Sequence, residues 1–237
     1  MKAIEVNKLV KKYGEIEAVR GATFSVEEKE IFGLIGPNGA GKTTILRILA
    51  TLIKKTEGKV KIFGYEIGKD NDKIRKIISY LPEEAGAYKN LTGREYLKFI
   101  ANFFNGEEMI GKGIKIANLG KRIDDKIESY SKGMIRKLLI ARALMTSPKL
   151  AILDEPTSGL DVINANEIRN LIRDYARRGT TFLISSHNML EVDYVCDRIA
   201  LINKGRIIEI DEPKNLKERY NAKNIEEVFI KVIKNAY

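Results

Sequence analysis

Apolar residues in this chain follow two alternating patterns, short uninterrupted runs and longer segments with helical spacing. The run Ile31–Ile35 is apolar throughout, which predicts a buried strand, and the apolar residues of Ile45–Leu49 recur at helical spacing. Leu150–Leu153 and Thr180–Ser185 predict further buried strands, with the helical pattern of Asp161–Arg177 between them. Because strands alternate with helices, the pattern predicts an α/β fold with a mainly parallel sheet.

The N-terminal part of the chain predicts a second set of strands. Ala3–Val10 and Ala22–Val26 mix apolar and polar residues, as expected for an antiparallel β lobe, and Lys11–Gly14 is interpreted as a turn. Gly58–Gly64 alternates with a period of two, which predicts a half-exposed strand. Ile77–Pro82 predicts one more apolar strand, which its proline ends.

The segment from Leu91 to Thr146 has helical spacing and predicts an inserted helical lobe. Thr92 is the expected N-cap of its first helix, with Glu95 at the capping-box position. The middle of the segment, residues 106–120, contains four glycines, and its pattern assigns no element. Ser131 is expected to open a further helix.

The C-terminal part predicts a return to the sheet. A short helix is expected at Met189–Val195, then a hairpin of Arg198–Asn203 and Arg206–Ile210, and finally two helices after Pro213 and Asn224. We therefore expect one domain of residues 1–237. Its core and β lobe would take up about residues 1–82 and 149–237, and its helical lobe about residues 83–148.

The composition limits the classes of protein that remain. No apolar run approaches the roughly 20 residues of a membrane helix, and the charged start Met1–Glu5 lacks the apolar region of a signal peptide. A single cysteine, Cys196, excludes an internal disulfide and is expected to be an inert thiol. These features predict a cytoplasmic protein.

The net charge of +10 is compatible with nucleic acid or an anionic membrane surface as a partner. The lysines and arginines are spread along the chain, however, and no block of five or six occurs. This distribution favours a well-solvated surface together with an anionic nucleotide ligand.

The strongest chemical signal is a phosphate-binding loop between the strand Ile31–Ile35 and the following helix. Its spacing is that of a P-loop, in which glycines allow backbone N–H groups to point at phosphate oxygens at a helix N-terminus. In this pattern Lys42 would hold the β- and γ-phosphates, and Thr43 would place its hydroxyl on Mg²⁺. The expected nucleotide-binding residues are Gly36, Pro37, Asn38, Gly39, Ala40, Gly41, Lys42, Thr43 and Thr44.

Two further polar groups follow predicted strands of the same sheet. Asp154 and Glu155 end one strand, where Asp154 could hold Mg²⁺ and Glu155 could polarise a water for attack on the γ-phosphate. Alternatively, the two carboxylates could cap the next turn. His187, the one histidine, follows another strand, where it could reach the γ-phosphate. The carboxyl ends of such strands are where ligands bind, so we expect Lys42, Glu155 and His187 to be the catalytic residues.

Five motifs, in their order and spacing, resemble the ATPase subunit of an ABC transporter over essentially the whole chain. The motifs are Gly36–Thr44, Tyr130–Met134, Leu150–Glu155, Ser158–Asp161 and His187. The resemblance implies a P-loop NTPase core with an antiparallel β lobe and an inserted helical lobe, and it implies ATP and Mg²⁺ as cofactors.

The same resemblance implies roles for four more residues. Tyr13 would stack on adenine, and Ser131 and Gly133 would contact the γ-phosphate held by the other subunit of a head-to-tail dimer. Asp161 matches the aspartate of the family's D-loop. The form Tyr-Ser-Lys-Gly-Met and the ending Asn224–Phe229 resemble the branch that powers drug, antibiotic or sodium export.

The chain also departs from the family's pattern. It contains no glutamine, and Glu83 stands where the family has its Q-loop glutamine. Because an ionised carboxylate only accepts hydrogen bonds, Glu83 is expected to approach Mg²⁺ more strongly than an amide does. Lys132 and Met134 replace a glycine and a glutamine of the common signature. The segment Leu91–Ser131, which normally meets the membrane partner, is also shorter than usual.

The leading interpretation is an ATP-hydrolysing subunit that powers transport through a permease in a separate chain. It would pair with a second ATPase subunit, identical or not, and lie at the cytoplasmic face of the membrane. An alternative, a nucleic-acid- or ribosome-associated ATPase of the same superfamily, rests on the positive charge alone. A small-molecule kinase would leave Ser131 and Asp161 without a purpose, and Glu155 argues against a non-hydrolysing scaffold.

Overall fold

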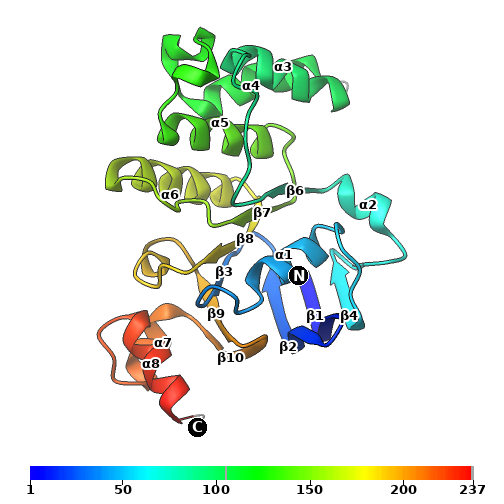
Figure 1. Ribbon diagram of the computed structural model, residues 1–237, viewed down its shortest axis with the longest axis vertical. Coiled ribbons are helices and arrows are strands. Elements are labelled where there is room, and N and C mark those ends of the chain that lie inside the picture. Colours follow the sequence, from blue (N-terminus) through cyan, green and yellow to red (C-terminus); the bar gives the residue numbers. More distant parts are fainter. Residues whose placement is uncertain (105, 236–237) are drawn as a thin grey trace.

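The computed structural model describes residues 1–104 and 106–235 and contains two β-sheets with helices packed around them (Figure 1). The six-stranded sheet has the order β10-β9-β3-β8-β7-β6, and the four-stranded sheet has the order β2-β1-β4-β5. The strands of the larger sheet are β3 (Ile31–Ile35), β6 (Ile78–Leu81), β7 (Leu150–Asp154), β8 (Thr181–Ser186), β9 (Arg198–Asn203) and β10 (Arg206–Asp211).

The larger sheet is mainly parallel, as the sequence pattern predicts. β3 lies between β8 and β9 and is parallel to both, β7 pairs in parallel with β6 and β8, and only β10 runs antiparallel to its neighbour. The carboxyl ends of β3, β7 and β8 therefore lie along one edge of the sheet. The loop after Ile35, the carboxylates after Leu153 and the histidine after Ser186 meet at this edge.

The smaller sheet is antiparallel, and its first two strands are longer than predicted. They are β1 (Lys2–Tyr13), β2 (Ile16–Glu27), β4 (Glu57–Ile62) and β5 (Tyr65–Glu66). The predicted turn at Lys11–Gly14 is wrong, because Lys11–Tyr13 continue the pairing with β2 and the chain turns only at residues 14 and 15. Four register shifts along this pair account for the irregular alternation that obscured the strands.

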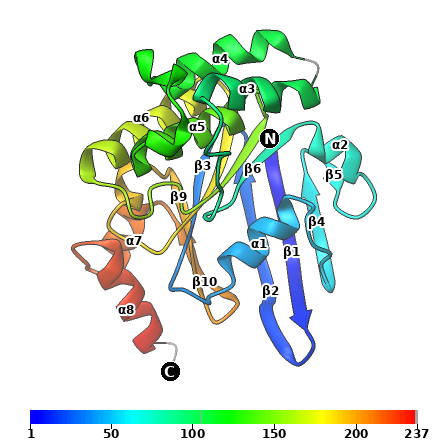
Figure 2. The same cartoon turned by 45° about the horizontal axis from the view of Figure 1, so that its top comes forward.

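A helical segment connects β6 to β7 and forms one end of the molecule, opposite the C-terminal helices (Figures 1 and 2). The capping box of its first helix is confirmed, because Thr92 Oγ1 accepts from Glu95 N and Glu95 Oε2 accepts from Thr92 N. Its elements are α3 (Gly93–Ala101), η1 (Asn102–Phe104), α4 (Glu107–Ala117), η2 (Gly120–Asp124), η3 (Ile127–Ser129) and α5 (Lys132–Leu144). The boundaries of a helical lobe at about residues 83 and 148 stay a prediction.

The remaining elements follow the predicted pattern with two exceptions. The expected helix Met189–Val195 is reduced to the single 3₁₀ turn η4 (Val192–Tyr194). The pattern also missed the short α2 (Asn71–Arg75). The other helices are α1 (Lys42–Leu49), α6 (Val162–Arg177), α7 (Pro213–Arg219) and α8 (Ile225–Asn235).

Two apolar cores lie on the two faces of the larger sheet, and β3 contributes to both. Phe32 and Leu34 pack with α1 and the antiparallel sheet, whereas Ile31 and Ile35 pack in the cluster that contains the apolar side chains of α5 and α6. Since side chains alternate along a strand, a strand buried on both faces must be apolar throughout. This burial fixes the position of the loop that follows Ile35.

Candidate functional site

The loop of residues 36–41 joins β3 to α1, and its close packing requires glycine at two positions. A Cβ atom on Gly36 would lie 2.2 Å from the carbonyl oxygen of Ile202, and one on Gly41 would lie 2.6 Å from that of Ala18. Gly41 has a φ of 105° and is the N-cap of α1, with no side-chain cap. The first N–H groups of α1 are therefore available to an anion, where the helix dipole also favours negative charge.

A pocket of about 180 Å³ lies against this loop. Its walls are the loop itself, the first turn of α1, one residue of β2 and two glutamates from other strand ends. The lining residues are Ala18, Pro37, Asn38, Gly39, Ala40, Gly41, Lys42, Thr43, Thr44, Glu83 and Glu155. Of the expected loop residues only Gly36 is not part of the lining. Ala18 was missed because no motif marks it and its strand was not recognised.

Lys42 is buried, and its ammonium group is held inside the loop. Its Nζ donates to the carbonyl oxygens of Gly36, at 2.6 Å, and Pro37, at 3.3 Å. The same Nζ lies 3.6 Å from Glu155 Oε1. Because a buried ammonium is stable only when it is hydrogen-bonded or paired, these contacts fix the position of its charge at the mouth of the loop.

The acidic pair at the end of β7 is held by the neighbouring strand β8. The Ser185 hydroxyl donates to Asp154 Oδ1 and accepts from the backbone N–H of Glu155, at 3.0 Å. Both carboxyl groups are buried. Glu155 has a φ of 49°, a left-handed conformation that L-residues rarely adopt. This backbone conformation separates the adjacent side chains, so that Asp154 contacts Ser185 and Glu155 reaches the pocket.

His187 contacts the same glutamate from the end of β8. Its Nδ1 lies 2.9 Å from Glu155 Oε2, and 45% of its side chain is exposed. A hydrogen on Nδ1 donates to the carboxylate, which leaves Nε2 of the neutral ring as an acceptor on the exposed side. The structure therefore brings Lys42, Glu155 and His187 into one contact network, with the glutamate between two basic groups.

Ser131, Gly133 and Asp161 lie together, but they do not line this pocket. Ser131 is the N-cap of α5 and accepts from Met134 N at 3.2 Å, and Asp161 is the N-cap of α6 and accepts from Asn164 N at 2.9 Å. A Cβ atom on Gly133 would lie 2.5 Å from Asn164 Cγ. Hydrogen bonds from Asn164 lower the pKa of Asp161 below its usual value. The two helix starts are thus joined through Asn164.

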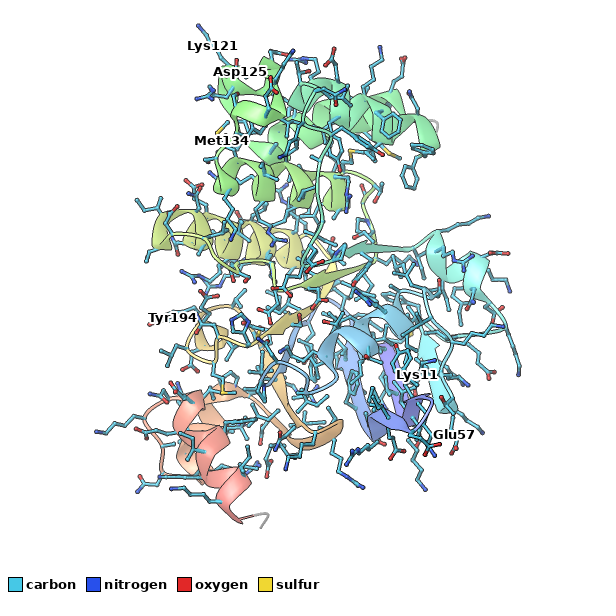
Figure 3. All side chains as sticks on the ribbon, in the orientation of Figure 1. Lys11, Glu57, Lys121, Asp125, Met134 and Tyr194 are labelled. Atoms are coloured by element: carbon cyan, nitrogen blue, oxygen red, sulfur yellow. The ribbon has the colours of Figure 1, made fainter. Side chains whose placement is uncertain are left out.

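The two unusual residues of this region differ in exposure. Lys132 is exposed, and its side chain lies over Gly159, where a Cβ atom would clash with Nζ. Met134 is half-buried on α5, at the edge of the helical segment (Figure 3). The start of α5 therefore presents a hydroxyl and a cation to the outside of the molecule.

Tyr13 also lies outside the pocket lining. It is at the end of β1, half exposed, and its ring is covered on one side by Lys11, whose Nζ lies 4.7 Å from the ring centroid. Lys11 and Glu57, which occupy neighbouring strands, mark this end of the antiparallel sheet in Figure 3. The expected contact with adenine stays a prediction.

The oxygen donors expected for Mg²⁺ suit that ion chemically. Thr43 and Glu83 line the pocket, and Asp154 lies beside Glu155. Hydroxyl and carboxylate oxygens are the hard ligands that Mg²⁺ takes. Within residues 1–104 and 106–235 no group of three or more His, Cys, Asp or Glu side chains is arranged around a metal site. This fits an ion that takes much of its coordination from water and nucleotide phosphates.

The site combines three features of one sheet. A glycine loop follows its central strand, a buried lysine lies in that loop, and an acidic pair ends a strand two positions away. Together these features define a P-loop nucleoside triphosphatase. Residues 19–158 match the family model described as ABC transporter. The chain therefore belongs to the ABC transporter ATPases, and it is the ATP-binding, ATP-hydrolysing subunit of such a transporter.

Two curated relatives are similar over almost the whole chain. The linearmycin resistance ATP-binding protein LnrL of Bacillus subtilis (strain 168) is 35% identical over 239 residues, which cover 99% of this chain and 77% of that protein. The bacitracin transport ATP-binding protein BcrA of Bacillus licheniformis is 38% identical over 226 residues, which cover 94% of this chain and 74% of that protein.

Solved structures of ATP-binding cassettes share the fold. The ATP-binding subunit of an ABC transporter superimposes with a TM-score of 0.86 at 25% identity, covering 98% of this chain and 99% of that one. A dimeric cassette in a post-hydrolysis state, bound to ADP and Pi, superimposes with a TM-score of 0.78 at 25% identity, covering 88% and 98%. No helix in the described part of the chain is long and apolar enough to cross a membrane.

Proposed function

We propose that this subunit powers export through a permease in a separate chain, as a peripheral protein on the cytoplasmic face of the membrane. The similarity to LnrL and BcrA, whose names refer to antibiotic resistance and transport, supports the direction and the class of cargo. The observation that carries the hydrolytic role is the position of Glu155 between Lys42 and His187 at the phosphate-binding loop.

The chemistry follows from the contacts of these three side chains. Lys42 holds the terminal phosphates by its charge, and Glu155 orients a water and accepts its proton during in-line attack on the γ-phosphate. His187 keeps Glu155 in place through Nδ1–H, and in its protonated form the ring also donates Nε2–H to the γ-phosphate. Thr43, Glu83 and Asp154 would hold Mg²⁺, which when bound neutralises charge on the β- and γ-phosphates.

Two copies would share each ATP molecule. Ser131, Gly133 and Asp161 lie away from the pocket of their own chain, so these residues are free to contact nucleotide bound by a partner. The start of α5 carries unpaired N–H groups and the dipole end that favours anions. In a head-to-tail dimer this helix start would close over the partner's γ-phosphate, and hydrolysis would open the pair.

The decisive experiment uses Glu155→Gln in purified protein. Removing the proton acceptor should lower the rate of ATP hydrolysis by roughly 10²-fold or more and leave ATP affinity within a few-fold of wild type. With Mg-ATP this variant should accumulate as a dimer, which light scattering coupled to gel filtration measures. The matched control is Glu128→Gln, at an exposed position on η3.

Two results would count against the proposal. Hydrolysis by Glu155→Gln within a few-fold of wild type would remove the assigned role of the carboxylate. If the variant binds Mg-ATP but stays monomeric, the proposal that two copies share each ATP is wrong.

A second variant, Ser131→Arg, tests whether the dimer uses the start of α5. It should abolish dimerisation without weakening ATP binding to the monomer.

A further inference from the structure

Arg136 is a buried arginine beside the nucleotide pocket that none of the expected motifs explains. It lies on α5, five residues after the N-cap Ser131, and only 7% of it is exposed. Its Nη2 donates to the backbone carbonyl oxygen of Glu83 at 3.2 Å. This bond joins α5 to the loop that follows β6, across the boundary between the helical segment and the sheet.

The second nitrogen of the same guanidinium group, Nη1, is buried and has no hydrogen-bond partner. A planar guanidinium is stable in the interior only when its donors are met and its charge is balanced. Burial lowers the pKa of Arg136, and the carboxylates of Glu83, Asp154 and Glu155 oppose that shift. Arg136 therefore interacts electrostatically with the three acidic residues that the proposed function assigns to Mg²⁺ and to the attacking water.

We propose that Arg136 is a positioning residue for Glu83, and that the two form a charge-compensated pair at the edge of the nucleotide pocket. The hydrogen bond to the backbone fixes the loop from which Glu83 reaches the pocket, and it places the positive charge of Arg136 at the base of that loop. This inference rests on the proposed role of Glu83 toward Mg²⁺. It adds a residue that holds the loop of Glu83 in place.

The position of Arg136 on α5 gives the pair a second consequence. Ser131 begins the same helix and is the residue offered to the partner's nucleotide, whereas Glu83 lines the chain's own pocket. Any displacement of the Glu83 loop is transmitted through the Arg136 hydrogen bond to the helix start. In a dimer, this hydrogen bond would be one connection within each chain between its two ATP sites.

Electrostatics fixes the sign of each expected change. Arg136→Met removes a positive charge, so free ATP, which is strongly negative, should bind more weakly, and Mg²⁺ should bind more tightly. Glu83→Gln removes a negative charge and should do the reverse. The factor by which Mg²⁺ strengthens nucleotide binding, here called the Mg²⁺ factor, should thus rise in Arg136→Met and fall in Glu83→Gln. In the double variant it should be close to the wild-type value.

The measurement is the affinity for a fluorescent ATP analogue, once with Mg²⁺ and once with EDTA. We expect the Mg²⁺ factor to rise at least about threefold in Arg136→Met, to fall by a similar factor in Glu83→Gln, and to lie within about twofold of wild type in the double variant. The matched control is Arg142→Met. Arg142 lies on the same helix, is half-buried and donates to Tyr96 Oη at 3.2 Å, so its loss should leave the factor unchanged.

Hydrolysis separates positioning from a merely structural role. If Arg136 acts through Glu83, Arg136→Met should lower kcat at least about tenfold in wild type and less than about twofold in the Glu83→Gln background. Arg136→Lys keeps the charge but loses the fork, so its Mg²⁺ factor should stay near wild type while kcat falls. This variant also serves as the test if Arg136→Met does not fold, since an altered Mg²⁺ factor in Arg136→Lys would contradict charge compensation.

Equal losses of kcat in both backgrounds, or a Mg²⁺ factor in Arg136→Met no higher than that of wild type, would overturn the pair. If Arg136→Met behaves like wild type while Glu155→Gln abolishes hydrolysis, the inference fails and the proposed function stands. If wild-type protein binds ATP without hydrolysing it, the proposed function fails instead.

Discussion

At the scale of single residues, the site depends on charges that are buried only because their partners are in place. Lys42 satisfies its ammonium group with two loop carbonyls and Glu155, and Glu155 in turn contacts His187. The bond from Lys42 Nζ to Gly36 O, at 2.6 Å, and the contact of His187 Nδ1 with Glu155 Oε2, at 2.9 Å, are short. Charge-assisted hydrogen bonds of this kind are worth about 1.5–3 kcal/mol. Removing one of these side chains therefore leaves a buried charge without its partner.

Lys42→Ala tests the phosphate contact directly. Loss of one charge-assisted contact should weaken ATP binding by roughly 10- to 100-fold and lower the rate of hydrolysis as well. Titration with a fluorescent ATP analogue measures the first effect. Lys69→Ala, which removes an exposed lysine paired with Glu66, is the control and should change neither. Unaltered affinity in Lys42→Ala would show that the phosphates do not reach Nζ.

The sequence indicates such residues only when a motif fixes their spacing. Lys42 and Asp154 follow apolar strands at recognisable positions, and the structure places them at the ends of the two strands that flank β8. Ala18 and Arg136 carry no such signal, because they reach the site from a strand of the other sheet and from the helical segment. Their approach depends on how these elements pack, which local pattern does not encode.

At the scale of elements, the sequence predicts a helix correctly where its apolar spacing and its capping residues are clear. The helices that begin after Thr92, Ser131 and Asp161 were predicted from their helical spacing, and for the first two also from the capping residues Thr92 and Ser131. All three caps are formed. α4 was missed because glycines lower helix propensity. One of these glycines, Gly113, is closely packed, since a Cβ atom there would lie 3.2 Å from both Leu97 and Met145.

The helix predicted at Met189–Val195 fails for a local reason. Ser186 Oγ accepts from Asn188 N at 3.0 Å, and Asn188 Oδ1 accepts from Leu190 N at 3.2 Å. Side chains that bond nearby N–H groups compete with helical bonding. The chain therefore forms a tight turn, which holds His187 next to Glu155, and only a single 3₁₀ turn follows.

Thr92→Ala tests the strength of the capping box. Loss of the hydroxyl removes the bond from Glu95 N and should lower the free energy of unfolding by about 1 kcal/mol. Chemical denaturation measures this change. Because α3 lies outside the pocket, ATP affinity should stay unchanged. Ser129→Ala, on η3 of the same segment, loses only a hydroxyl bond to the Lys126 carbonyl and is the control. If Thr92→Ala weakens ATP binding by more free energy than it lowers stability, α3 is not independent of the nucleotide pocket.

At the scale of the whole molecule, the helical segment carries an aromatic patch formed by Tyr88, Phe99 and Phe103. Their rings pack edge to face, with centroids 5.4 and 5.2 Å apart, and all three are exposed. Exposed aromatic clusters mark interaction surfaces. The patch lies on the segment that we expect to meet the permease.

A double variant, Tyr88→Ser with Phe103→Ser, should separate ATP binding from assembly. We expect unchanged ATP affinity, because neither side chain lines the pocket, and a loss of at least about tenfold in recovery of the permease. The permease to use is the membrane protein encoded beside this chain, and recovery is measured by co-purification from detergent-solubilised membranes. Tyr194→Ser is the control, since Tyr194 is an exposed aromatic residue away from the patch (Figure 3). Equal recovery of the permease would place the contact elsewhere.

The hairpin between β9 and β10 has a consequence for handling the protein. Its tip residue Gly205 donates to the carbonyl of Ala40 at 2.9 Å and accepts from Arg20 N at 2.8 Å. Hairpin tips usually tolerate inserted peptides and protease cleavage. Here the tip is hydrogen-bonded to the nucleotide loop and helps to hold it in place. We therefore expect an affinity tag inserted at this turn, or a protease cut there, to weaken ATP binding, although the turn does not line the nucleotide pocket.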